Sequence, residues 1–205
     1  DNTVAWYENN GQGSFTKAII DAEATGAAFA TPADVDGDGD LDVIAGWQVG
    51  NAIAWYENQG NRQFLRRWID TESGANHVMV VDIDGDGDPD VLADGPQSGS
   101  VFLYENYGVG QFTQQLVTNQ APSIQWAFAY DIDQDGDIDV ASAAFETNKI
   151  AWYESNALPT FSAPTSIEAE EDSSAFTIDI NNVTPGGREN QQVRFSGIST
   201  LELKP

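Results

Sequence analysis

Apolar, β-branched and aromatic residues occur in short runs that are separated by Gly, Asn and Asp. This pattern predicts β-strands joined by tight turns. In the clearest unit the runs predict four strands, near residues 27–33, 41–46, 52–57 and 63–69. No segment combines the 3.6-residue apolar period of an amphipathic helix with capping residues. The pattern therefore predicts an all-β chain built from four-stranded units.

Two sequence motifs recur in one register along the chain. An aspartate-rich run recurs in steps of 48 and 49 residues, starting at Asp34, Asp82 and Asp131. An apolar run that ends in Tyr-Glu-Asn or Tyr-Glu-Ser recurs with it, at residues 4–9, 53–58, 101–106 and 150–155. Four strands in a repeat of this length are typical of a β-propeller blade. We predict a partial propeller of about three and a half blades.

These two motifs resemble the FG-GAP/VCBS repeat family. They are Asp-x-Asp-Gly-Asp-Gly-Asp-x-Asp-Val and, about 11 residues later, Ile-Ala-Trp-Tyr-Glu-Asn. The resemblance covers about residues 1–161. It implies propeller blades similar to those in the head of integrin α subunits, with calcium ions that stiffen the hairpin between the first two strands of a blade. It also implies a glycan or protein ligand.

Each Asp-rich loop places five carboxylates within nine residues, which like-charge repulsion disfavours unless a cation lies among them. Calcium takes 6–8 oxygen ligands in a flexible loop, whereas magnesium demands near-octahedral geometry. Carboxylates at loop positions 1, 3, 5 and 9 and the carbonyl at position 7 would supply ligands, and glycine at position 6 allows the bend. We predict about three Ca²⁺ ions, one per loop, held by Asp34, Asp36, Asp38, Asp40, Asp42, Asp82, Asp84, Asp86, Asp88, Asp90, Asp131, Asp133, Asp135, Asp137 and Asp139.

Charge and composition narrow the possible partners. The chain has 8 basic and 33 acidic residues, a net charge of −25, which disfavours binding to nucleic acid or to an anionic membrane surface. No apolar run is long enough for a spanning helix, so we expect no membrane insertion. Cysteine is absent, which excludes disulfides and thiolate sites. Fifteen of the acidic residues lie in the three loops. We therefore expect the negative charge to serve ion binding first and to affect the choice of partner second.

The aromatic residues mainly predict packing. The Trp-Tyr pairs fall on the third strand of each unit, where adjacent side chains point to opposite faces. His77 shares its repeat position with Phe29 and Trp126, which indicates an aromatic packing position, and no catalytic residues are nominated. Trp47 differs, because it falls in the variable stretch between the second and third strands. Binding residues concentrate in such loops, so Trp47 is the candidate ligand contact.

The repeat predicts two regions, a partial propeller at residues 1–161 and a second region at residues 162–205. The second region resembles a linker followed by an incomplete Ig-like or cadherin-like β-sandwich, with strands at residues 176–180 and 192–195. The sequence starts within a repeat unit, and an open stack of blades exposes sheet edges. We therefore expect the remainder of a longer parent chain, or ring-completing copies, as a partner.

The leading hypothesis is a non-catalytic, calcium-binding β-propeller module of a secreted or cell-surface protein, serving adhesion or ligand binding. Calcium loops that lack the distal glutamate of an EF-hand suit extracellular calcium concentrations. Two alternatives stay open. In the first alternative, the chain is the accessory propeller region of a polysaccharide-degrading enzyme. In the second, it is a structural or filament subunit that calcium stiffens.

Overall fold

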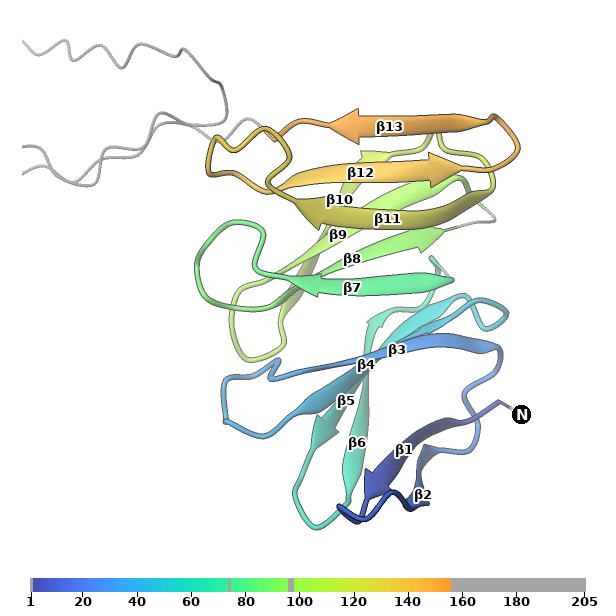
Figure 1. Ribbon diagram of the computed structural model, residues 1–205, viewed down its shortest axis with the longest axis vertical. Coiled ribbons are helices and arrows are strands. Elements are labelled where there is room, and N and C mark those ends of the chain that lie inside the picture. The colour runs from blue at the N-terminus through green and yellow to red at the C-terminus, as the bar shows by residue number, and fades with distance from the viewer. Residues whose placement is uncertain (1, 74, 96–97, 156–205) are drawn as a thin grey trace, which may run out of the picture. The chain divides into compact units, whose positions relative to one another are not determined.

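In the computed structural model, the described residues form thirteen strands, which follow the predicted repeat (Figure 1). The structure describes residues 2–73, 75–95 and 98–155. The chain divides into two compact units, one of residues 1–132 with 138–153 and one of residues 133–137 with 154–205. All thirteen strands belong to the first unit, and the fold is described for that unit.

The strands form four antiparallel sheets that follow one another along the chain (Figure 1). The first sheet has two strands, β1 (Val4–Asn9) and β2 (Phe15–Asp21). The second has four, β3 (Ala27–Ala33), β4 (Asp42–Trp47), β5 (Ala52–Asn58) and β6 (Phe64–Asp70). The third also has four, β7 (His77–Val81), β8 (Asp90–Gly95), β9 (Ser100–Asn106) and β10 (Phe112–Thr118). The last has three, β11 (Ile124–Tyr130), β12 (Asp139–Ala144) and β13 (Lys149–Tyr153).

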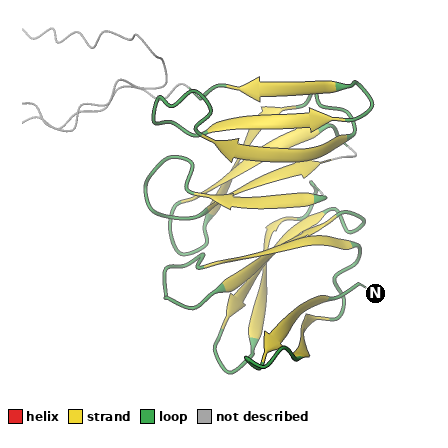
Figure 2. Cartoon of the chain, viewed as in Figure 1, coloured by secondary structure: helices red, strands yellow, loops and turns green. Residues whose placement is uncertain are grey.

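The structure confirms the all-β prediction. Each of the four strands predicted for the clearest unit ends within one residue of its observed bounds, and the described residues contain no helix (Figure 2). The strands predicted at residues 176–180 and 192–195, the domain boundary after residue 161 and the sandwich-like segment lie outside the described residues.

Each sheet has two chemically different faces, because neighbouring residues of the strand that carries the repeated Trp-Tyr or Leu-Tyr motif (β1, β5, β9 or β13) point in opposite directions. The face that carries the Trp or Leu of the repeated motif is called here the Trp side, and the opposite one, which carries the Tyr, the Tyr side. The side chains that define the Trp sides are Trp6, Trp55, Leu103 and Trp152. Those that define the Tyr sides are Tyr7, Tyr56, Tyr104 and Tyr153.

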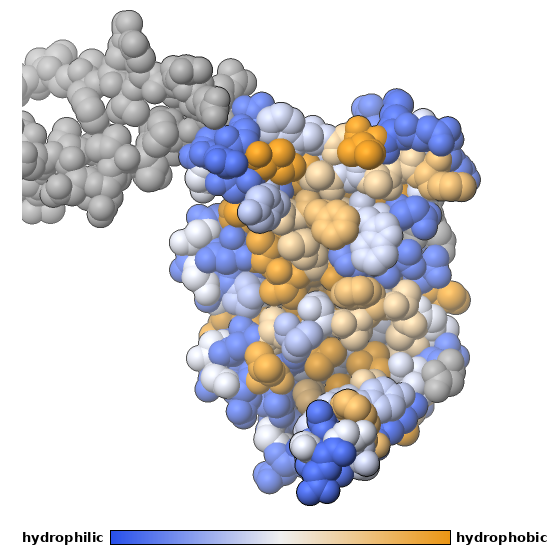
Figure 3. Space-filling view, in the orientation of Figure 1, coloured by the Kyte–Doolittle hydropathy of each residue, from blue (hydrophilic) through white to orange (hydrophobic). Residues whose placement is uncertain are grey.

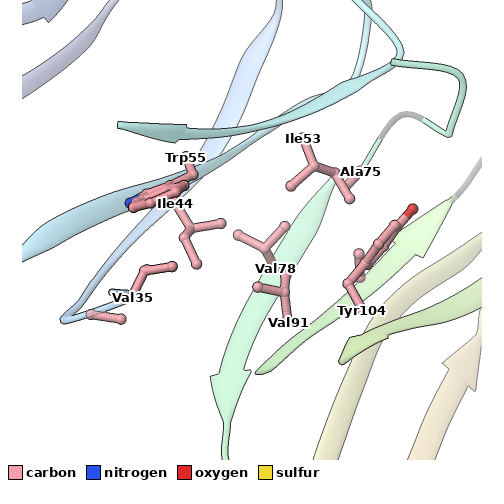
Figure 4. Close-up of a cluster of buried hydrophobic side chains, with 10 residues drawn as sticks. Val35, Ile44, Ile53, Trp55, Ala75, Val78, Val91 and Tyr104 are labelled. Atoms are coloured by element: carbon pink, nitrogen blue, oxygen red, sulfur yellow. The ribbon is translucent and has the colours of Figure 1, made fainter. Parts of the chain in front are cut away.

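The hydrophobic core lies between successive sheets, where a Trp side packs on the Tyr side of the next sheet. Figure 4 shows Ile44, Ile53 and Trp55 of the second sheet facing Val91 and Tyr104 of the third, all of them buried. A similar cluster joins the third sheet to the fourth, and another joins the first to the second. The predicted packing role of the third strand is thus confirmed at the inner sheets, where burying each large side chain stabilises the fold by about 1.5–3 kcal/mol.

Hydrogen bonds at the same interfaces tie the sheets together. The hydroxyl of Tyr104 donates to Asp70 Oδ2 at the end of the preceding sheet, at 2.7 Å. The hydroxyl of Tyr56 donates in the same way to Asp21 Oδ2, at 3.0 Å. Burial and the adjacent carboxylate raise the pKa of both tyrosines, so the hydroxyls remain protonated donors.

The inner strands β3, β7 and β11 carry a line of aromatic rings. The ring of His77 lies 4.4 Å from that of Phe29 and 4.6 Å from that of Trp126, centroid to centroid. Burial lowers the pKa of His77. The predicted aromatic packing position is therefore confirmed by contact. The face in view in Figure 3, over these strands, carries hydrophobic side chains along its middle between hydrophilic flanks.

Candidate metal sites in the Asp-rich loops

The first Asp-rich loop joins β3 to β4 and brings three carboxylates together. Oxygen atoms of Asp34, Asp36 and Asp38, the residues at loop positions 1, 3 and 5, all lie within 4.8 Å of one another. Asp34 Oδ1 is buried and has no hydrogen-bond partner. A buried anionic oxygen without a partner is costly, and a cation among these three groups would satisfy it.

The loop backbone is shaped around these carboxylates. The N–H of Gly39 donates to Asp34 Oδ2 at 3.0 Å, and the N–H of Asp40 donates to Asp38 Oδ1 at 2.8 Å. Gly39 has a φ of +93°, a conformation that glycine adopts without a steric penalty. Burial, together with the negative charges of Asp42, Asp38 and nearby Glu57, raises the pKa of Asp36. The loop thus concentrates negative charge that a divalent cation would neutralise.

Asp42, at loop position 9, is fully buried and has a structural role. Its Oδ2 accepts hydrogen bonds from the N–H of Val35 at 3.1 Å and from Trp55 Nε1 at 2.8 Å. Its Oδ1 accepts one from the N–H of Asn58 at 2.7 Å. Asp42 therefore fastens the loop to the third strand of its sheet. Its role as a metal ligand stays a prediction.

The second loop, between β7 and β8, repeats this arrangement. Oxygen atoms of Asp82, Asp84 and Asp86 lie within 4.8 Å of one another. Asp90 takes the place of Asp42 and accepts hydrogen bonds from the N–H groups of Ile83, at 2.9 Å, and Asn106, at 2.8 Å. Burial and, to a smaller extent, the neighbouring carboxylates raise the pKa of Asp90 to about 6, although these two hydrogen bonds lower it.

The third loop is divided between the two compact units, so each part is described within its own unit. In the first unit the N–H of Ile132 donates to Asp139 Oδ2 at 3.2 Å. In the second the N–H of Asp137 donates to Asp135 Oδ1 at 3.0 Å. Gln134, which replaces a glycine of the other loops, has a φ of +63° and so keeps the left-handed backbone that Gly37 and Gly85 adopt. The metal roles of Asp131, Asp133 and Asp135 rest on the repeat.

The Tyr-Glu-Asn motif also belongs to these sites, which the sequence reasoning missed. The side-chain amide of Asn106 donates to the carbonyl oxygens of Pro89, at 3.3 Å, and of Val35 in the loop of the preceding sheet, at 2.9 Å. The carboxylates of Glu57 and Glu105 raise the pKa of nearby loop aspartates, after the larger effect of burial. The constant spacing between the Asp-rich motif and the Tyr-Glu-Asn motif could have predicted that both belong to the same site.

Trp47 lies in a different place from the one predicted. It is the last residue of β4 rather than part of the loop, and only 6% of its surface is exposed. Its ring packs edge-on against that of Trp68, with centroids 5.0 Å apart, and the guanidinium of Arg66 lies 5.5 Å from its centroid. A ligand that stacked on Trp47 would have to displace these neighbours. Its role as a ligand contact stays a prediction.

A cavity of about 470 Å³ lies between the first two sheets, within the usual size range of small-ligand pockets. Its lining is mostly apolar and includes Trp6, Pro32, Val43 and Phe64, with Asn58 as a polar group. Trp6 is 37% exposed here, whereas Trp55 is buried in the corresponding position of the next sheet. The cavity is therefore a second place at which a ligand could contact a tryptophan.

A comparison with known protein families agrees with the repeat. Residues 1–45 and 34–93 match the family described as FG-GAP-like repeat. No curated protein matches the sequence. Among solved structures, the chain is similar to a lectin of Agrocybe aegerita, described in terms of its specific recognition of non-reducing terminal N-acetylglucosamine. The two are 26% identical with a TM-score of 0.49, and the match covers 70% of this chain and 41% of the lectin chain.

In the described residues, no helix has the length and apolar character needed to cross a membrane.

The sequence matches, the four-stranded sheets and the loop between the first two strands of each complete sheet describe the same repeat. The match to the FG-GAP-like repeat family thus covers residues 1–93, which hold the first two sheets and the start of the third.

Proposed function

We propose that this chain is a non-catalytic, calcium-binding β-propeller module of a secreted or cell-surface protein, and that it binds a glycan or protein ligand in adhesion. The observation that carries the metal part is the convergence of Asp34, Asp36 and Asp38, with one buried carboxylate oxygen that lacks a hydrogen-bond partner. All the candidate ligands are oxygen atoms, which suits a hard cation such as Ca²⁺.

The ion would supply charge neutralisation rather than chemistry on a substrate. Three carboxylates per loop, assisted by the carbonyl at position 7 and the aspartate at position 9, would hold it. A bound Ca²⁺ would offset the repulsion among the loop aspartates and would thereby stiffen the hairpin that joins the first two strands of a blade. The match to FG-GAP-like repeats supports this assignment and the extracellular setting.

Calcium titration by isothermal calorimetry tests the metal proposal directly. We expect about three binding sites for Ca²⁺ and much weaker binding of Mg²⁺ at the same ionic strength. Chelation with EDTA should lower the melting temperature, because an ion that binds only the folded state stabilises it by mass action. Absence of calcium binding in the calorimeter would contradict the proposal.

The ligand part has two candidate positions, Trp47 and the cavity beside Trp6. A glycan array, with a protein-binding screen beside it, should identify a ligand. Trp6→Ala and Trp47→Ala then distinguish the two positions. Because Trp47 is buried, each variant needs a melting curve, so that a loss of binding is compared only between folded proteins. Equal affinity of both variants and the wild type would exclude both positions.

A further inference from the structure

The glutamate of the Tyr-Glu-Asn motif lies beside the first two Asp-rich loops. The residue after Glu57 donates its backbone N–H to the position-9 aspartate of the first loop at 2.7 Å, and the residue after Glu105 does the same in the second loop at 2.8 Å. Each glutamate also adds to the negative charge that raises the pKa of a central loop carboxylate, Asp36 or Asp84, after the larger effect of burial. Both glutamates therefore contribute to the charge that a cation in the loop would meet.

The two loops themselves are closely matched. Both have the sequence Asp-x-Asp-Gly-Asp-Gly-Asp-x-Asp, starting at Asp34 and at Asp82. In both, the carboxylates at positions 1, 3 and 5 have oxygen atoms within 4.8 Å of one another, and the two glycines have a positive φ. The residues around the loops differ more than the loops do, so they are where a difference in ion binding would arise.

The charge of Glu57 is compensated. Arg67 Nε donates to Glu57 Oε2, and Gln59 Nε2 donates to Glu57 Oε1 at 2.7 Å. The guanidinium of Arg67 also lies 5.4 Å from the ring centroid of Trp55. The side chain of Glu57 is only 16% exposed, so solvent and salt screen this ion pair less than a fully exposed one. In the first loop, an arginine thus offsets the glutamate.

The charge of Glu105 is not compensated. Within the described residues Glu105 pairs with no cation, and its carboxylate accepts one hydrogen bond, from the hydroxyl of Tyr107 to Oε2 at 2.6 Å. A neutral donor leaves the negative charge in place. In the strand register, Gln115 of the third sheet stands where Arg67 stands in the second. Two equivalent positions, one cationic and one neutral, therefore lie beside two equivalent loops.

We propose that this register position determines how tightly the neighbouring loop binds calcium: Arg67 lowers the affinity of the first loop by offsetting Glu57, and the neutral Gln115 lets Glu105 raise the affinity of the second. A calcium ion is attracted by the total negative charge around it, including charges that do not coordinate it. The inference rests on the calcium part of the proposed function. It adds Arg67, Glu57 and Glu105 to the residues that act on the ion.

The test uses the full chain with one intact loop at a time. Asp133→Asn silences the third loop in both proteins, and Asp84→Asn or Asp36→Asn then leaves only the first or only the second. Arg67→Gln is made in the first-loop protein and Gln115→Arg in the second-loop protein, so that each loop receives the neighbour of the other. Both side chains are exposed, and melting curves in EDTA verify that each variant folds.

Lys149→Gln, made in both proteins, is the control for net charge. Lys149 is exposed and begins β13, so its loss changes the charge of the chain as Arg67→Gln does, away from Glu57 and Glu105. Each variant is compared with its own parent, so the different exposure of the two loops does not enter the comparison.

Calcium titration by calorimetry at low ionic strength, where surface charges are least screened, gives the result. We expect Arg67→Gln to bind Ca²⁺ about three- to tenfold more tightly than its parent, and Gln115→Arg about three- to tenfold more weakly. The rise in melting temperature on adding calcium should grow in the first variant and shrink in the second. If both affinities stay within the change caused by Lys149→Gln, the inference is wrong, although calcium binding by the parents stands. If neither parent binds calcium, the proposed calcium function fails and the inference fails with it.

Discussion

Replacing Asp84 by Asn should have opposite effects on stability with and without calcium. Asp84 lies in the second loop, with carboxylate oxygens of Asp82 and Asp86 no more than 4.8 Å from its own. Burial and these neighbouring charges raise its pKa, which is the sign of a carboxylate whose ionised form is disfavoured. Without metal, Asp84→Asn removes one of three mutually repelling charges; with metal, it removes a ligand.

The expected magnitudes follow from the distances. Two unit charges 4.8 Å apart repel by about 0.9 kcal/mol in water, so relief from two neighbours should stabilise the metal-free protein by about 1–2 kcal/mol. Calcium affinity depends on the number of charged ligands. We expect an affinity loss of more than about thirtyfold, which corresponds to about 2 kcal/mol and therefore outweighs the charge relief and lowers the net stability in saturating calcium.

Urea unfolding in excess calcium and in EDTA measures both effects on the same protein. Asp88→Asn is the matched control, because it removes the same charge from the same loop but at position 7, where the backbone carbonyl is the predicted ligand. We expect the control to show a small change of the same sign in both buffers. If Asp84→Asn shifts stability in one direction in both buffers, or behaves like Asp88→Asn, the loop does not bind calcium through the carboxylates named here.

Three further predictions concern packing and charge away from the loops. Tyr104→Phe removes the hydroxyl that donates to Asp70 and should cost about 1.5–3 kcal/mol in urea unfolding, whereas the same change at exposed Tyr7 should cost little. Trp47→Ala should cost about 3–5 kcal/mol, because its ring is buried among neighbours, and a variant as stable as the wild type would show that the ring is not packed. Burial raises the pKa of Asp94 to about 7, so the penalty for its charge is present above pH 7 and is relieved as the pH falls towards 4. As the pH falls from 7 to 4, the free energy of unfolding of the wild type should therefore rise by up to about 4 kcal/mol relative to that of Asp94→Asn. Unfolding curves of the two proteins at several pH values measure this difference. A difference that does not change with pH would show that Asp94 titrates normally.

The local pattern was enough to predict the strands and the loops. Short apolar runs between Gly, Asn and Asp placed the strands of the second sheet within one residue, because each strand and its turns are determined by adjacent residues. The convergence of Asp34, Asp36 and Asp38 was likewise readable from their alternating spacing.

Burial was less predictable, because it depends on residues far away in the sequence. Trp55 and Trp152 occupy the same position of the same motif, yet one is buried and the other is half exposed. Within the described residues another sheet follows the one that carries Trp55 and none follows the one that carries Trp152, and the motif does not encode this difference. Trp47 was misplaced for a related reason: its strand extends one residue further than predicted, and the residues that cover it, Arg66 and Trp68, come from a strand two positions away in the sheet.

The buried aspartate at position 9 connects the candidate metal loop to the rest of the blade. Asp42 receives hydrogen bonds from the loop itself, at Val35, and from the third strand, at Trp55 and Asn58. Asn106 of the next sheet then donates to the carbonyl of Val35. A single network therefore joins one Asp-rich loop, its own sheet and the adjacent sheet. An ion bound among the outer carboxylates would restrain the loop at one end of this network, so its stabilising effect would reach the interface between blades as well as the hairpin that holds it.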